Sequence, residues 1–515
     1  MAKNGILKNT ALVGGFTALS RVLGLVREML QARLIGAGVE QSAFALAFAI
    51  PNMARKLFGE GALTAAFVPV FKAEMESQAV DSARRLARAV MTMSLMMLVS
   101  IVIIVFLGLE CVVQWSAELE LSSRTLLTIR LIKTMLPYMI FICGAAFGMG
   151  VLNSLGRFKA SSFMPCLLNF VWIGSLGWIL FHPELRFDQR IHRVAMAILI
   201  AGAVQFAFML WRMHCAGVTP KLTFSGWRDE KVCKVWRNTA LAAIGAGAVQ
   251  INYMLDQVLA QLASPWAAGV IGYAERLMDL PLGVIGVAFG TVLLPTFAGF
   301  FAKGDNQGAQ NALSSSIRNM MFVMLPAAAG LVVLAPEITM VIYEGDAFKA
   351  LDTMRVSRAL AMYSVGLGFY GLQKSLVPWF QAQNDMKTPL KVSAYAVVLN
   401  AMLNIVAIAA LPEEWRHVGL AASTVVSALF SCILLIGLVG KDARAALKSS
   451  LLHFIKIVFA SLGMAMALYF LKPHLATLNY ILAMALSVIA GVAIYAALAF
   501  SLLSIGRHSV KKLER

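Results

Sequence analysis

The chain has 515 residues, of which 60% are hydrophobic and only 14% are charged. Because soluble domains carry about 25% charged residues, this composition excludes a soluble protein and indicates an integral membrane protein with many spans. The formal net charge of +18 would suit a nucleic-acid partner, so the positions of the basic residues decide what it means. The first residues, MAKNGILKN, are followed by no A-x-A-like cleavage site, so the first span is predicted to be permanent.

Apolar windows of about 20 residues predict the membrane-spanning helices. Taken in chain order, they predict about 14 spans, with approximate limits 10–36, 42–70, 87–114, 127–152, 160–182, 193–213, 237–262, 266–299, 318–343, 356–382, 388–411, 417–440, 451–471 and 478–505. Proline interrupts several of them, which is tolerated in a bundle because neighbouring groups satisfy the freed backbone. The predicted fold is therefore an all-α polytopic membrane protein.

The loops between these spans alternate between a basic side and a less basic side. With the N-terminus in the cytoplasm, the inside loops carry most of the Lys and Arg, including the longest loop at about 214–236. The outside loops hold fewer basic residues together with acids such as Glu118 and Glu344. This bias follows the positive-inside rule and accounts for most of the net charge. We therefore expect no nucleic-acid partner, and an even number of spans places both termini in the cytoplasm.

The two halves of the chain resemble each other weakly. A span ending in a polar turn (137–159) is followed by LLNFVWIG, and a similar span (362–387) is followed by VLNAMLNIV. Chance similarity between apolar segments is the alternative, but a duplicated helical lobe is a common transporter plan. We predict two pseudo-symmetric six-helix lobes and two extra helices. The domains are 1–215 (N-terminal lobe), 216–236 (cytoplasmic linker), 237–440 (C-terminal lobe) and 441–515 (two extra helices and tail).

Charged residues within the predicted spans are costly, by a few kcal/mol each even on lenient insertion scales. Three stretches hold several of them: SRVLGLVREMLQARLIG (20–36), PNMARKLFGEG (51–61) and YAERLMDLP (273–281). The second stretch places Asn52, Lys56 and Glu60 at four-residue spacing, hence on one helix face. The residues of interest are Arg21, Arg27, Glu28, Arg55, Lys56, Glu60, Glu275, Arg276 and Asp279.

These charges have two interpretations. Internal ion pairs would be structural, joining Lys56 to Glu60, Arg276 to Glu275 or Asp279, and Arg21 to Glu28. Pairing leaves an excess of cations in spans 1 and 2, and unpaired arginine in a bundle needs water or an anion. Because the forked donors of arginine suit phosphate, the second interpretation is a water-filled cationic cavity that receives an anionic headgroup.

A second polar set suits a cation. Asp256 lies in span 7, Asn400 and Asn404 lie four residues apart in span 11, and Thr424 lies in span 12. One carboxylate with amide and hydroxyl oxygens suits a hard monovalent cation, so Na⁺ is the candidate coupling ion. The alternatives are interhelical hydrogen bonds, a protonated Asp256, or a structural pair with Lys374, whose role stays open. We expect no other metal and no cofactor.

The chain shows no catalytic constellation, no P-loop and no GxSxG motif, so we do not expect an enzyme. The residues alone support an anionic lipid headgroup as the ligand. Together with the family resemblance given in the next paragraph, they leave three functions: a flippase for a lipid-linked saccharide, a drug/cation antiporter of the same superfamily, and a membrane scaffold for cell-wall assembly proteins. The antiporter would favour an acidic and aromatic cavity, and a scaffold needs no buried cations.

The stretches SRVLGLVRE, FAIPNMARKLFGEGALTAAFVPVF and YAERLMDLPLGVIGVAFGTVLLPTF resemble the signatures of the MurJ (MviN) lipid II flippase family. That family lies within the multidrug/oligosaccharidyl-lipid/polysaccharide exporter superfamily. The resemblance implies two lobes around a central cavity that opens alternately to each side of the bacterial inner membrane. It implies transport of lipid II, the undecaprenyl-diphosphate-linked peptidoglycan precursor, for cell-wall biogenesis and cell shape. Membrane lipids and proteins of cell-wall synthesis and division are the other partners it suggests.

The resemblance also assigns individual residues. The family's cavity arginines match Arg21, Arg27, Arg55 and Arg276, and its span-2 acid matches Glu60. Lys56 stands where a second arginine is frequent, so the charge is kept and the forked geometry is lost.

One position departs from the family pattern. Members often carry an aspartate early in span 2, where this chain has Ser42, with Glu40 two residues earlier. Either Glu40 substitutes for that acid or the contact is absent.

Overall fold

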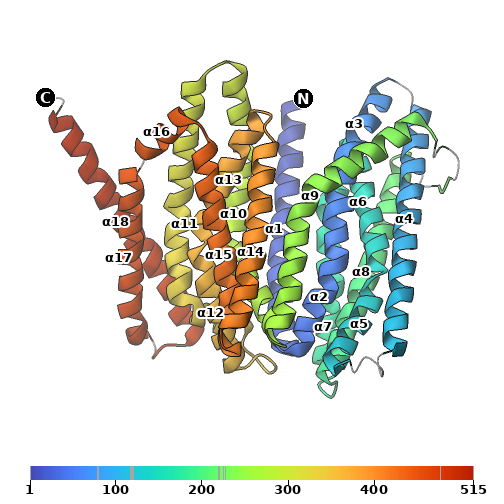
Figure 1. Ribbon diagram of the computed structural model, residues 1–515, viewed down its shortest axis with the longest axis horizontal. Helices are drawn as coiled ribbons and strands as arrows, with labels where there is room; N and C mark the ends of the chain where they lie inside the picture. The colour runs from blue at the N-terminus through green and yellow to red at the C-terminus, as the bar shows by residue number, and fades with distance from the viewer. Residues whose placement is uncertain are drawn as a thin grey trace. The chain divides into compact units, whose positions relative to one another are not determined.

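The computed structural model describes residues 2–77, 80–115, 121–218, 221–223, 226, 228–449, 451–475 and 477–513. Within its helices, side chains are described except at 2–12, 58–61, 241, 244–246, 248, 249, 284–288, 290, 291, 449 and 504–513. The regular structure of the described residues is helical throughout (Figure 1). The prediction of an all-α protein is confirmed.

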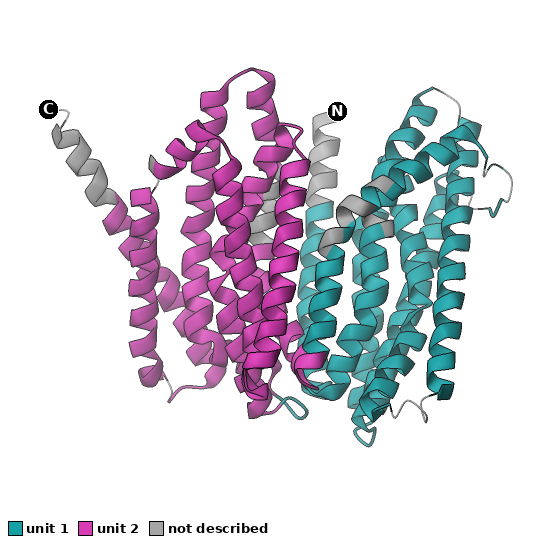
Figure 2. Ribbon diagram, in the orientation of Figure 1, with its two compact units in different colours: residues 1–261, 345–348 teal, residues 262–344, 349–515 magenta. Residues whose placement is uncertain are grey.

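The chain divides into two compact units, which Figure 2 shows in teal and magenta. Unit 1 comprises residues 1–261 and 345–348, and unit 2 comprises residues 262–344 and 349–515. The helices from the N-terminus onward are α1 (Ala2–Ile35), α2 (Val39–Ala54), the π-helix η1 (Arg55–Ala62), α3 (Leu63–Glu76), α4 (Val80–Gln114), α5 (Ser123–Met135), α6 (Tyr138–Ser154), α7 (Phe158–Leu180), α8 (Phe187–Cys215) and α9 (Glu230–Ala263).

The helices that follow α9 belong to unit 2. They are α10 (Ala267–Ala302), α11 (Asn306–Tyr343), α12 (Ala350–Val365), α13 (Leu367–Ala382), α14 (Lys387–Ala410), α15 (Glu413–Leu438), α16 (Lys441–Ser449), α17 (Leu451–Leu475) and α18 (Tyr480–Leu513). The two last long helices pack on α11, and α17 and α18 pack on each other.

Each predicted span coincides with one long helix or with a run of successive helices. Span 2 becomes α2, η1 and α3, span 4 becomes α5 and α6, and span 10 becomes α12 and α13. Nine helices of the described part are long and apolar enough to cross a membrane by length and composition alone. Among the described residues, they correspond to the predicted spans 3, 4, 5, 6, 9, 11, 12, 13 and 14. The chain is a multi-pass membrane protein.

The interruptions in spans 4 and 10 lie at a proline and at a glycine. Pro137 follows the end of α5, and proline lacks the N–H that would continue the helix. Gly366 separates α12 from α13, and a Cβ atom there would lie 2.8 Å from the Val425 side chain. The packing order around these breaks is the same in both units: α5 and α6 pack on α8, as α12 and α13 pack on α15. This repeated order supports a duplicated helical plan.

The boundary of the compact units differs from the predicted domain limits. It falls at Gln261, near the end of α9, whereas the N-terminal lobe was predicted to end at 215. Most of α9, the predicted first helix of the C-terminal lobe, is therefore grouped with unit 1. An internal repeat and compact packing need not divide a chain at the same residue, and the four domain limits stay a prediction.

A short segment of the α11–α12 connection, residues 345–348, packs within unit 1. The Ala347 N–H donates to the Arg33 carbonyl at 3.0 Å, just before the turn at Gly36. Gly36 has φ +80, and a Cβ atom there would lie 2.7 Å from the Ala347 carbonyl oxygen. Both the backbone conformation and the close approach therefore require glycine at this turn.

Candidate functional site: polar groups within the spans

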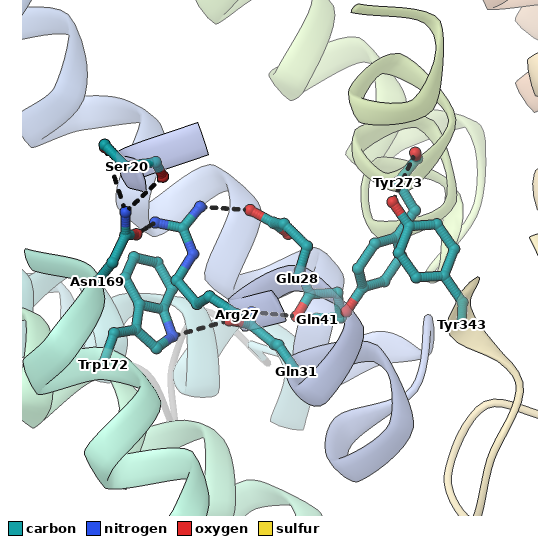
Figure 3. Close-up of polar contacts among 9 residues, drawn as sticks. All are labelled: Ser20, Arg27, Glu28, Gln31, Gln41, Asn169, Trp172, Tyr273 and Tyr343. Atoms are coloured by element: carbon teal, nitrogen blue, oxygen red, sulfur yellow. Dashed lines mark hydrogen bonds and ion pairs between the residues drawn. The ribbon is translucent and has the colours of Figure 1, made fainter. Parts of the chain in front are cut away.

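Arg27 lies in a network of polar contacts between α1 and α7 (Figure 3). Its Nη1 donates to Asn169 Oδ1 at 3.0 Å, and its Nη2 forms an ion pair with Glu28 Oε1 at 2.6 Å. The guanidinium lies over the Trp172 ring, 4.3 Å from the ring centroid. Arg27 is thus paired with its sequence neighbour, a partner that none of the predicted ion pairs assigned to it. The excess of positive charge in span 1 is the same as the sequence indicated, because Glu28 is its one acid in either pairing.

The same network continues toward α2. Trp172 Nε1 donates to Gln31 Oε1, and Gln31 Nε2 donates to Gln41 Oε1, both at 2.9 Å. Gln31, Gln41 and Trp172 are all buried. These hydrogen bonds satisfy polar groups that would otherwise be costly in a membrane protein, and they join α1, α7 and α2.

The charged stretch of span 2 forms the π-helix η1. Arg55 Nε and Nη2 donate to Asn52 Oδ1 at 3.2 and 3.0 Å, and Lys56 Nζ lies 5.2 Å from the centroid of the Tyr253 ring. Single π-helical turns are frequent at functional sites, because the wider turn changes which side chains share a face. Glu60 belongs to η1, but its side chain lies outside the described residues, so its predicted pair with Lys56 stays a prediction.

The remaining predicted cavity arginines have exposed side chains. Arg21 is exposed on α1, and Arg276 is exposed on α10 together with Asp279. Their neighbour Glu275 is half-buried and accepts a hydrogen bond from the Tyr363 hydroxyl at 3.3 Å. Arg21, Arg27, Arg55 and Lys56 all belong to unit 1, whereas Arg276 belongs to unit 2.

Ser42, which stands where the family often has an acid, is completely buried in α2. Its carbonyl oxygen accepts a hydrogen bond from Gln261 Nε2 at 2.5 Å. Glu40 lies in the first turn of α2, where the helix dipole favours a negative charge, and is half-buried. A buried serine offers no charge at this place, so Glu40 stays the candidate substitute.

The predicted cation site is divided between the units. In unit 2, Asn404 Nδ2 donates to Asn400 Oδ1 at 3.0 Å, and Asn400 Nδ2 lies 3.4 Å from Thr424 Oγ1. In unit 1, Asn252 Nδ2 donates to Asp256 Oδ2 at 3.2 Å. The structure therefore brings the two asparagines and the threonine together, and it places Asp256 beside an amide of its own helix. Lys374 is exposed on α13.

Several interacting residues were missed at the level of sequence. Asn169 and Trp172 lie in LLNFVWIG, and Asn169 corresponds to Asn400 when this stretch is aligned with VLNAMLNIV. That repeat was the available signal. Two acids within spans were also missed, Glu110 and Glu337. Glu110 pairs with Lys133, and Glu337 Oε1 pairs with Lys472 Nζ at 2.6 Å.

A contact outside the predicted spans joins the start of α9 to the end of α3. Lys231 Nζ, at the start of α9, lies 2.8 Å from Glu74 Oε1 near the end of α3, and Ser82 donates to the same carboxylate. The Lys231 contact, followed by the Ser82 hydrogen bond, holds the pKa of Glu74 below its ordinary value.

This chain is a helix bundle that carries ionic and amide groups inside its spans. These features are typical of polytopic membrane transporters. Within that class, the chain belongs to the lipid II flippase MurJ family, whose family model matches residues 31–505. A probable lipid II flippase MurJ of Rhizobium tropici is 35% identical over 79% of this chain and 77% of its own length. A second, of Haemophilus influenzae, is 32% identical over 89% of this chain and 91% of its own length.

Solved structures share the fold at lower identity. The structure of lipid II flippase MurJ in an inward closed conformation aligns with a TM-score of 0.78 and 22% identity, covering 97% of this chain and 99% of that one. An inward-facing multidrug resistance MATE family transporter of the MOP superfamily aligns with a TM-score of 0.68 and 13% identity, covering 85% and 99%. The expected superfamily fold is confirmed.

Proposed function

We propose that this chain flips lipid II from the cytoplasmic to the periplasmic leaflet of the bacterial inner membrane, for peptidoglycan synthesis. The observation that carries the proposal is membership of the family over residues 31–505, at 35% and 32% identity to relatives named as probable lipid II flippases. The chain acts as a transporter and not as an enzyme.

The chemistry of the spans supports a substrate with an anionic headgroup. Neutral amides orient two of the guanidinium groups: Asn169 accepts a hydrogen bond from Arg27, which also pairs with Glu28, and Asn52 accepts from Arg55. Lys56 Nζ lies against the ring of Tyr253, a contact that favours a positive charge. Groups of this kind form charge-assisted hydrogen bonds with phosphate oxygens, worth about 1.5–3 kcal/mol each. Arg21 and Arg276 belong to the same proposed set.

Alternating access would move the headgroup across the membrane, and an ion gradient would supply its direction. In this proposal Asp256, Asn400, Asn404 and Thr424 form a Na⁺ site. A bound ion shifts a conformational equilibrium only by its differential affinity for the two states. Both termini are proposed to lie in the cytoplasm. Labelling of single cysteines should then occur from outside at position 347, and at position 308 only after permeabilisation.

The test of function uses the purified chain reconstituted in liposomes that contain labelled lipid II. An enzyme added outside modifies only the outer leaflet, so flipping is measured as the additional fraction of lipid II that becomes accessible. Transport of lipid II, with no equal transport of a phospholipid, is the expected result. Equal transport of another polyprenyl-diphosphate saccharide would instead assign the broader substrate class. Absence of lipid II transport in active liposomes would contradict the proposal.

The arginines provide the second part of the test. Alanine variants at Arg21, Arg27, Arg55 and Arg276 should reach the membrane but fail to complement loss of a native flippase. Full complementation by three of the four would show that these cations do not carry the headgroup.

A further inference from the structure

We propose that Asn169 and Trp172 of α7 are positioning residues, which hold the Arg27 guanidinium in one orientation for a phosphate group. The inference rests on the proposed function, because the phosphate belongs to the diphosphate of a lipid-linked substrate. It concerns side chains of span 5, whereas the predicted site residues of the N-terminal lobe lie in spans 1 and 2.

Asn169 is held at both ends of its amide. Its Oδ1 accepts the hydrogen bond from Arg27 Nη1 at 3.0 Å, and its Nδ2 donates to the Ser20 carbonyl at 3.0 Å. Only 4% of Asn169 is exposed. Because the carbonyl of Ser20 needs a donor, the amide oxygen can only face Arg27. The orientation of Asn169, and therefore the position of Nη1, is determined by the backbone of α1.

Trp172 supports the guanidinium from a second direction. It lies three residues after Asn169, hence on the same face of α7, and its ring lies under the guanidinium at 4.3 Å. Its own position is secured by the hydrogen bond from Nε1 to Gln31 and by the ring of Phe44, which packs edge-on at 5.8 Å. Trp172 is 3% exposed. The ring plane that faces Arg27 is therefore fixed.

The donors of Arg27 that remain are suited to an anion. A guanidinium has five N–H donors, of which Asn169 and Glu28 each take one. The buried Nε has no hydrogen-bond partner among the described residues. Neither the amide nor the ring carries a charge, so both orient the cation without neutralising it. Phosphate oxygens match this arrangement of forked donors.

The experiment measures binding of undecaprenyl diphosphate, which has no sugar, to the purified full chain. Asn169→Leu and Trp172→Leu should each weaken binding about tenfold, the factor that corresponds to 1.4 kcal/mol. The matched control is Trp178→Leu, the same change at an exposed position of the same helix, where no change is expected. In the background of Arg27→Ala, Asn169→Leu should weaken binding no further, since Asn169 acts only through Arg27.

Two further variants keep the test independent of folding. Trp172→Phe retains an aromatic ring and should bind more tightly than Trp172→Leu. Asn169→Asp retains the acceptor but adds a negative charge beside Arg27, so it should bind weakly while unfolding at the wild-type temperature. Additive losses in the double variant, or wild-type binding by Asn169→Leu, would overturn the inference.

The outcomes separate the inference from the function on which it rests. A wild-type chain that flips lipid II and binds undecaprenyl diphosphate, with unaffected Asn169 and Trp172 variants, would refute the inference alone. A wild-type chain that does neither would refute the proposed function. Phosphatidylglycerol is the second probe: if its binding falls as much as that of undecaprenyl diphosphate, the phosphate comes from a membrane lipid and the proposed source is wrong.

Discussion

Replacing Gly36 by alanine should destabilise the protein at the turn between α1 and α2, for two separable reasons. The backbone of Gly36 is left-handed, with φ +80, which costs a residue with a Cβ atom about 1–2 kcal/mol. The new Cβ atom would also lie 2.7 Å from the Ala347 carbonyl oxygen, so the 345–348 segment must move. Movement that breaks the Ala347–Arg33 hydrogen bond adds about 0.5–1.5 kcal/mol.

Gly156→Ala is the matched control. Gly156 has φ +71, and a Cβ atom there would meet nothing within 4 Å. It therefore carries the backbone cost without the collision, and the difference between the two variants measures the docking of the segment. The assay is unfolding of the purified protein by SDS titration, together with the rate of proteolysis within 345–348. Equal destabilisation by the two variants would refute the reasoning, because the segment would then contribute nothing.

Three other predictions concern charges. Lys56→Arg should keep flipping activity and Lys56→Glu should abolish it, since a negative charge would repel the substrate anion; an active Lys56→Glu protein would place this side chain away from the substrate path. Na⁺ should raise the unfolding temperature of the wild type above its value in K⁺ at matched ionic strength, and Asp256→Asn should remove that difference. If the unfolding temperature of the wild type is the same in Na⁺ and in K⁺, Asp256 has a structural role. The contact with Lys231 lowers the pKa of Glu74 in the folded state. The Glu74 carboxylate therefore stabilises the fold at pH values above its ordinary pKa of 4.5, and this contribution is lost as the pH falls through the folded-state pKa. Glu74→Gln should therefore lower the unfolding temperature at pH 7 and have little effect at acidic pH, whereas an equal effect at both would exclude the charge as the cause.

The span pattern could be predicted because bilayer thickness acts on each segment separately. A helix needs about 20 apolar residues wherever the rest of the chain lies, and basic loops record the side of the membrane without reference to packing. The breaks in spans 4 and 10 were less visible, since Pro137 acts locally whereas Gly366 separates helices where α15 approaches closely. The family motifs likewise identified the charged stretches 20–36 and 51–61, because local sequence alone carries them.

The partners of the charged residues were decided by tertiary structure. Glu28 pairs with Arg27, its neighbour along the chain, a contact that the sequence spacing did not suggest, because rotamer and neighbouring helix determine where a guanidinium points. Asn169 lies 142 residues from Arg27 along the chain, so no periodicity could connect them. The same holds for Lys472 and Glu337. A single span determines its own length and polarity, but the cost of a charge inside it depends on the groups that neighbouring helices bring within hydrogen-bonding distance.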